Sequence, residues 1–157
     1  MYRLQNFNLF LLTDCNFWII LESERMAKTM DITIGLKGEA RTMAEREDTA
    51  LEVGSGSLLV YATPCMVALM EGAACEALKD LLPEDKTSVG TALEISHISA
   101  TPVGLEVWAE AEITAVDGNT VTFQVTAFDE SGKIGEGTHK RVIVNTQRFL
   151  DKAYAKL

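Results

Sequence analysis

Apolar and polar residues alternate along the second half of the chain, a pattern that predicts β-strands. From Leu105 to Ile113 every second residue is apolar, and most residues between them are charged. Asp117-Gly118 and Ser131-Gly132 are dipeptides typical of the turns between antiparallel strands. The predicted strands span residues 88–99, 105–113, 121–127 and 134–144.

The segment TPCMVALMEGAA, residues 63–74, begins a predicted helix that runs from Pro64 to about Leu81. Thr63 is in position to cap the helix with its hydroxyl, and proline suits the first helical turn. The helix is apolar on nearly all sides, so we expect a sheet to wrap around it. With a first strand predicted within 38–50 and a loop at 54–57, the element order indicates an α+β fold: a curved antiparallel sheet around one long central helix.

Composition limits the classes of function. The 157 residues are 47% hydrophobic, enough for one core and few for two domains. The formal net charge of −9 disfavours nucleic acid as a partner. Three cysteines without paired spacing and two histidines predict no metal site and a reducing, cytoplasmic location.

The N-terminal segment, residues 1–29, differs from the rest because it is rich in aromatic and apolar residues. Thr13-Asp14 interrupts its apolar run, which is shorter than the ~20 residues of a membrane-spanning helix. We therefore predict no membrane span. Since Met26 and Met30 precede the compact part, we expect residues 1–29 to be an extension upstream of the natural start and residues 30–157 to form one domain.

Glu71 is the unusual residue of the predicted helix, since it lies among small and apolar neighbours. Burial would make such a carboxylate a stronger base. The pattern alone favours a buried structural role for His97, because it is in phase with Val89 and the apolar residues that follow. It favours a helix cap for Thr63 and a bulge for Gly90. His139 is predicted to be structural or interfacial, and Cys65 and Cys75 to be core residues.

Three segments together resemble the fluoroacetyl-CoA thioesterase-like branch of the hotdog-fold thioesterases: GSGSLLVYATPCMVALMEGAA, TSVGTALEISHISATPVG and IGEGTHKRVIV. Their order and spacing match over about residues 36–149. The resemblance implies a hotdog fold, a homodimer or higher homo-oligomer, and acyl-CoA sites at the subunit interface. It also implies hydrolysis of an acyl-CoA thioester, with coenzyme A as part of the substrate and no separate cofactor.

The resemblance assigns roles to five residues. Thr63, Glu71 and His97 correspond to catalytic residues, Gly90 lies near the thioester carbonyl, and Arg141 belongs to the substrate-binding region. Glu71 either activates water or attacks the carbonyl itself, and the sequence leaves both routes open. Thr63 orients a neighbour, acts as nucleophile or only caps the helix.

Two other functions also fit this sequence. The domain either binds acyl-CoA without chemistry, or it hydrates an enoyl-CoA with the same carboxylate and histidine. The aromatic gate of the fluoroacetyl-CoA enzyme is missing, because the matching stretch is Gly54-Ser-Gly-Ser57 with Tyr61 as the nearest aromatic residue. We therefore expect a short-chain or other acyl-CoA and assign no fluoroacetyl specificity.

Overall fold

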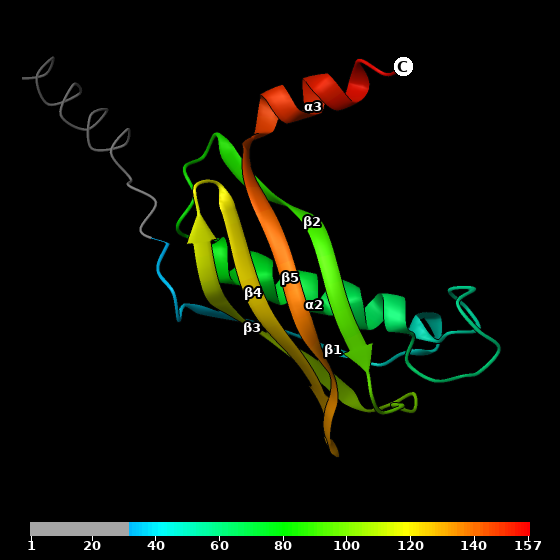
Figure 1. The fold of residues 1–157 in the computed structure, drawn as a ribbon. Helices are drawn as coiled ribbons and strands as arrows, with labels where there is room; N and C mark the ends of the chain where they lie inside the picture. The colour runs from blue at the N-terminus through cyan, green and yellow to red at the C-terminus, as the bar shows by residue number, and fades with distance from the viewer. Residues whose placement is uncertain (1–31) are drawn as a thin grey trace, which may run out of the picture.

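A computed structural model describes residues 32–157, in which one antiparallel sheet curls around a helix (Figure 1). The strand order is β1-β3-β4-β5-β2, so β1 and β2 are the free edges of the sheet within this described part of the chain. The elements are β1 (Lys37–Met43), η1 (Arg46–Asp48), α2 (Thr63–Leu78), β2 (Lys86–His97), β3 (Glu106–Asp117), β4 (Thr120–Asp129), β5 (Gly132–Asn145) and α3 (Thr146–Tyr154). The predicted α+β architecture is confirmed, and the predicted extension over residues 1–29 lies outside the described residues.

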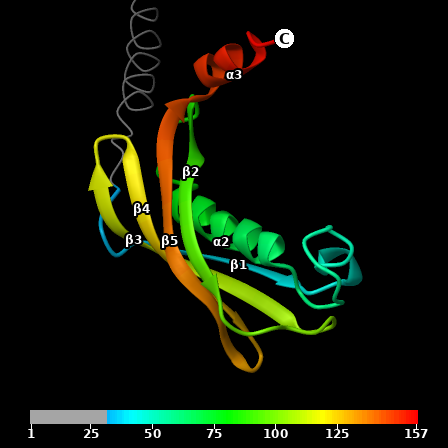
Figure 2. The same cartoon turned by 45° about the vertical axis from the view of Figure 1, so that its right-hand side comes forward.

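The core lies between α2 and the concave face of the sheet (Figure 2). The helix contributes Met66, Met70, Ala73, Ala74, Ala77 and Leu78. It packs mainly on β1 and β3. Gly38 permits this packing, because a Cβ there would collide with the helix backbone at Ala73 and Ala77. The side of α2 towards β5 and β2 is less covered, which leaves part of the concave face open.

Several predicted boundaries were wrong. The first strand ends at Met43, and residues 46–48 form a 3-10 helix. Helix α2 ends at Leu78, three residues earlier than predicted. Its N-cap is Ala62, and no side chain caps it. Thr63 is the first helical residue, and its hydroxyl bonds His97 instead of the helix backbone.

A bulge in β2 corrects the predicted phase of that strand. Gly90 pairs with Arg141, whereas Ala92 pairs with Lys140, so Thr91 is an extra residue. Without the bulge, residues seven positions apart would lie on opposite faces of the sheet. The extra residue returns His97 to the concave face, on which Gly90 also lies. The expected alignment of His97 with Val89 is therefore wrong, because the bulge lies between them.

Helix α3 was not predicted. The Asn145 side chain accepts a hydrogen bond from the backbone N–H of Arg148, at 3.0 Å, and so caps it. This cap and the helical spacing of Phe149, Leu150, Ala153 and Tyr154 were the signals available in the sequence. Within residues 32–157, no helix is long and apolar enough to cross a membrane.

Candidate active site

Glu71 lies on α2 and faces strands β5 and β2. Its Oε2 is 3.3 Å from an Nη of Arg141, an ion pair across the concave face. Arg141 also donates from Nε to the Ser88 hydroxyl, at 2.9 Å, and from its second Nη to the Ser88 carbonyl, at 2.8 Å. Because the guanidinium is 6% exposed and held by three bonds, it fixes the position of the carboxylate.

His139 extends this network from β5. It is fully buried, and its Nδ1 donates to the carbonyl of Ala92 at 3.0 Å. Its Nε2 accepts from Arg141 at 3.1 Å. Burial lowers the pKa of His139, and the charge of Arg141 lowers it further, against opposing effects of the Ala92 bond and Glu71. A neutral imidazole that supports Arg141 agrees with the structural role predicted for this histidine.

Gly90 provides the space that the Glu71 carboxylate occupies. A Cβ at this position would lie 2.7 Å from Glu71 Oε2 and 3.1 Å from His139 Cε1. The predicted bulge at Gly90 is also present, immediately after it. Gly90 therefore both makes room for the Glu71 carboxylate and precedes the bulge. Of the atoms around it, the carboxylate oxygen comes closest.

The carboxylate is less buried than the sequence suggested. Its side chain is 38% exposed. The expectation of a buried glutamate is wrong for the single chain, because α2 leans towards β1 and β3 and leaves its Glu71 side open. Substrate or another protein surface has access to this side.

Thr63 and His97 form a second cluster at the N-terminal end of α2. Thr63 Oγ1 is 2.8 Å from His97 Nδ1. The Nε2 of His97 is buried and has no hydrogen-bond partner among residues 32–157. Both residues line a pocket of about 360 Å³, with Tyr61 and Ile98 also in its wall. Burial raises the pKa of the Tyr61 hydroxyl, which keeps it protonated.

The two clusters are separated along both elements that carry them. Thr63 precedes Glu71 by eight residues, about 12 Å along a helix axis. His97 follows Gly90 by seven residues, about 23 Å along a strand. A single chain thus pairs Thr63 with His97 and Glu71 with Gly90 and Arg141, but does not join the two groups.

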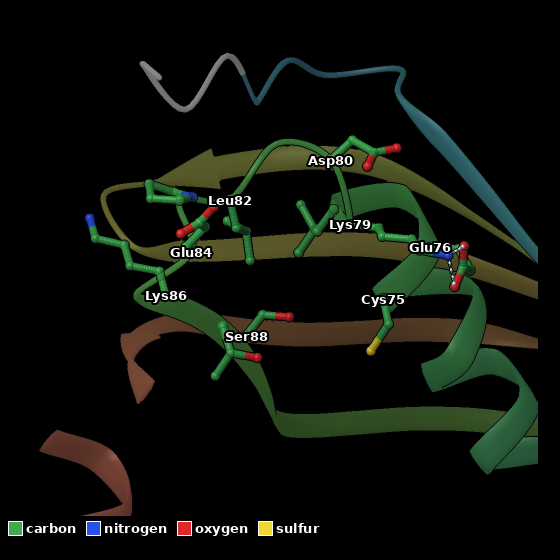
Figure 3. Close-up of a pocket in the computed structure, with 11 residues that line it drawn as sticks. Cys75, Glu76, Lys79, Asp80, Leu82, Glu84, Lys86 and Ser88 are labelled. Atoms are coloured by element: carbon green, nitrogen blue, oxygen red, sulfur yellow. Dashed lines mark hydrogen bonds and ion pairs between the residues drawn. The ribbon is translucent and has the colours of Figure 1, made fainter. Parts of the chain in front are cut away.

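A hollow of about 500 Å³ adjoins the Glu71 cluster, between the end of α2 and the start of β2. Figure 3 shows Cys75 and Ser88 on its opposite walls. Ser88 also accepts a hydrogen bond from Arg141, so this wall of the hollow lies next to the Glu71–Arg141 ion pair. Lys79 and Lys86 line it together with acidic residues, so its charge is mixed.

Lys140, Cys65 and Cys75 belong to neither cluster. Lys140 is exposed, whereas neighbouring Arg141 is buried on the concave face. They therefore do not form one basic group for phosphates. Cys65 is half-buried, but Cys75 is exposed, which corrects its prediction as a core residue. No metal-binding group of His, Cys, Asp and Glu occurs among residues 32–157.

The sequence pattern of the fluoroacetyl-CoA-specific thioesterase family, FlK, matches residues 44–147. The chain belongs to this family. It is 39% identical over 97 residues to the fluoroacetyl-CoA thioesterase of Streptantibioticus cattleyicolor, a match that covers 62% of this chain and 70% of that protein.

Solved structures agree with this membership. A variant of FlK in complex with fluoroacetate and CoA is 31% identical, with a TM-score of 0.71 over 75% of this chain and 99% of the other. A thioesterase superfamily member from Thermus thermophilus is 28% identical, with a TM-score of 0.71 over 80% of this chain and 98% of the other. The predicted hotdog fold and thioesterase activity are thereby confirmed.

Proposed function

We propose that the protein hydrolyses acyl-CoA thioesters at a site completed by two copies of the chain. One copy supplies Thr63 and His97, and its partner supplies Glu71, Gly90 and Arg141. The observation that carries this proposal is the division of the site residues into two separate clusters on the same concave face.

The free edge of β2 provides a way to join the clusters. Two β2 strands paired antiparallel about a two-fold axis run in opposite directions, so the end of one lies near the start of the other. A pairing centred between Gly90 and His97 brings His97 of one copy towards Gly90 of the second. The open side of Glu71 then faces the Thr63–His97 pair.

The Thr63–His97 hydrogen bond supports nucleophilic catalysis. His97 Nδ1 accepts the hydroxyl proton as Thr63 Oγ1 attacks the thioester carbonyl. The C–S bond breaks, CoA leaves as its thiol after receiving that proton, and an acyl ester remains on Thr63. Glu71 of the second copy then takes a proton from the water that attacks the ester carbonyl. The bond between the acyl carbon and Thr63 Oγ1 breaks, the proton returns to that oxygen, and the free acid leaves.

The substrate class is an acyl-CoA with an unassigned acyl group. The loop before α2 contains Gly54, Ser55, Gly56 and Ser57, and no aromatic residue closes the pocket from this loop. The small side chains leave room beside Thr63. We therefore expect the enzyme to accept acyl groups other than fluoroacetyl, with its selectivity set by other parts of the site.

A panel of acyl-CoAs tests the activity, with thiol release and enoyl absorbance recorded together. We expect thiol release from the wild-type chain and trapping of the acyl group on Thr63, located by peptide mass. An acyl group on Glu71 would reassign the nucleophile to that carboxylate. Binding without thiol release would instead support an acyl-CoA-binding protein, and loss of enoyl absorbance alone would support a hydratase.

A further inference from the structure

Helix α3 lies at the start of β2 and has few contacts with the other elements that the structure describes. Among residues 32–157 it packs chiefly against the end of β5. The backbone N–H of Thr146 donates to the Asp85 carbonyl at 2.9 Å, and the Asn145 amide donates to the Asp85 carboxylate at 3.0 Å. These bonds fix the beginning of α3, and the helix then extends past the free edge of β2 (Figures 1 and 2).

The helix exposes apolar side chains along its length. Phe149 is 43% exposed, Leu150 41% and Tyr154 66%, and no residue of α3 is buried. A nine-residue helix is too short to be stable in water by itself. Its charged side chains are Arg148, Asp151 and Lys152, which give the helix a net charge of +1. An apolar surface of opposite charge is therefore the expected neighbour.

Such a surface lies at the other end of β2, on residues 45–59 and the adjoining Ile98. Leu58 is 65% exposed, Leu59 48% and Ile98 53%. The acidic residues of this segment are Glu45, Glu47, Asp48 and Glu52, against a single basic residue, Arg46. The segment extends past the β2 edge on the same side as α3 (Figures 1 and 2).

Within one chain the two surfaces cannot meet, because the twelve residues of β2 separate them by about 40 Å. The antiparallel two-fold pairing described above reverses the strand. It brings the start of β2 in one copy, with α3, to the end of β2 in the other, with residues 45–59.

We propose that α3 of each copy packs on residues 45–59 of its partner. The inference rests on the dimer of the proposed function and adds a contact outside the paired strands. Phe149, Leu150 and Tyr154 cover the partner's exposed leucines, and the basic side chains lie near its acidic residues. Because Ala50 and Ser55 of this segment line the Thr63–His97 pocket, α3 also closes one side of the partner's pocket.

Site-directed cross-linking tests this contact in the full-length chain. One chain carries only Leu150→Cys and a second carries only Leu58→Cys, both with Cys15, Cys65 and Cys75 replaced by serine. The two chains are mixed, allowed to exchange subunits and treated with a short bifunctional maleimide. Val116→Cys, an exposed apolar position on the β3–β4 hairpin, replaces Leu150→Cys in the matched control.

We expect a linked product that contains both chains, and none from either single-cysteine chain alone or from the Val116→Cys mixture. Dimers by sedimentation that show no such link would overturn the placement of α3 and leave the β2 dimer intact. Chains that sediment as monomers would overturn both. Thiol release from acyl-CoA, measured on the wild-type chain, reports separately on the proposed function.

A charge variant gives a second measurement that does not depend on the linker. Lys152→Glu, added to the chain with Leu150→Cys, is expected to lower the yield of linked product at low ionic strength. The difference should shrink at high salt, since exposed charges are screened there. An unchanged yield at low salt would contradict the proposed charge pairing.

Discussion

The two clusters of the candidate site differ in how many bonds hold them within one chain. Glu71 is paired with Arg141, which Ser88 and His139 hold on the strands. The Thr63–His97 pair has one hydrogen bond, an exposed threonine and a ring nitrogen that finds no hydrogen-bond partner in residues 32–157. Residues of β2 and β5 thus hold the Glu71 carboxylate in place within one chain, whereas the Thr63 hydroxyl and the His97 imidazole lie at the start of α2 and the end of β2. In the proposed dimer, a second copy meets them there.

Removing the charge of Glu71 is expected to have the largest effect. Glu71→Gln keeps the shape of the side chain but loses the base and the ion pair with Arg141, so kcat should fall by about 10²–10⁴-fold. Thiol release at saturating acyl-CoA measures it. Glu110→Gln, an exposed residue of β3, is the control and should retain wild-type turnover. Equal rates for both variants would remove Glu71 from the mechanism.

The Thr63–His97 pair is expected to act as a unit. Thr63→Val and His97→Ala should each lower kcat by about 10²-fold or more, and the double variant should lose little beyond either one, because each change breaks the same bond. Thr63→Ser keeps the hydroxyl and should retain much of the rate. If the losses multiply in the double variant, the two residues act independently.

Gly90→Ala tests the position of the carboxylate without removing it. The added methyl group would lie 2.7 Å from Glu71 Oε2, and the flexible side chain would move away. A displacement of about 1 Å can cost about 10²-fold in rate. The thermal midpoint should change little, so activity and stability are measured on the same sample. Full activity would show that Glu71 needs no such close approach.

The lowered pKa of His139 predicts a smaller effect, which is on the pH dependence of the free energy of unfolding. Its pKa in the folded chain is below 6.5, so the unfolded chain binds a proton first as the pH falls below that value. This histidine therefore stabilises the fold above pH 6.5 and loses that contribution as the pH falls through its folded pKa. His139→Asn should flatten this part of the curve in urea unfolding. If the free energy of unfolding depends on pH in the same way in this variant, groups other than His139 cause that dependence.

Much of the fold was predictable because it follows local patterns. Alternation located β3, β4 and β5, and the apolar run located α2. The bulge after Gly90 was harder, since it depends on pairing with β5. Without it, Gly90 and His97 would have been assigned to opposite faces of the sheet.

The site was only partly predictable for a related reason. Arg141 as the partner of Glu71 and Ser88 as its support come from strands far apart in sequence. The helix cap was assigned to Thr63 from its neighbours in the sequence. In the structure its hydroxyl instead contacts His97, 34 residues away. Long-range contacts decide these roles, and a single sequence shows them only through resemblance.

Mixing two inactive variants tests the shared site most directly. A chain with His97→Ala and a chain with Glu71→Gln are each expected to be inactive as homodimers. In a mixed dimer, the intact His97 of one chain meets the intact Glu71 of the other, so one of the two sites is complete. We predict that thiol release returns on mixing, towards half the wild-type rate per dimer. If mixed dimers form and remain inactive, the site lies within one chain and the account is wrong.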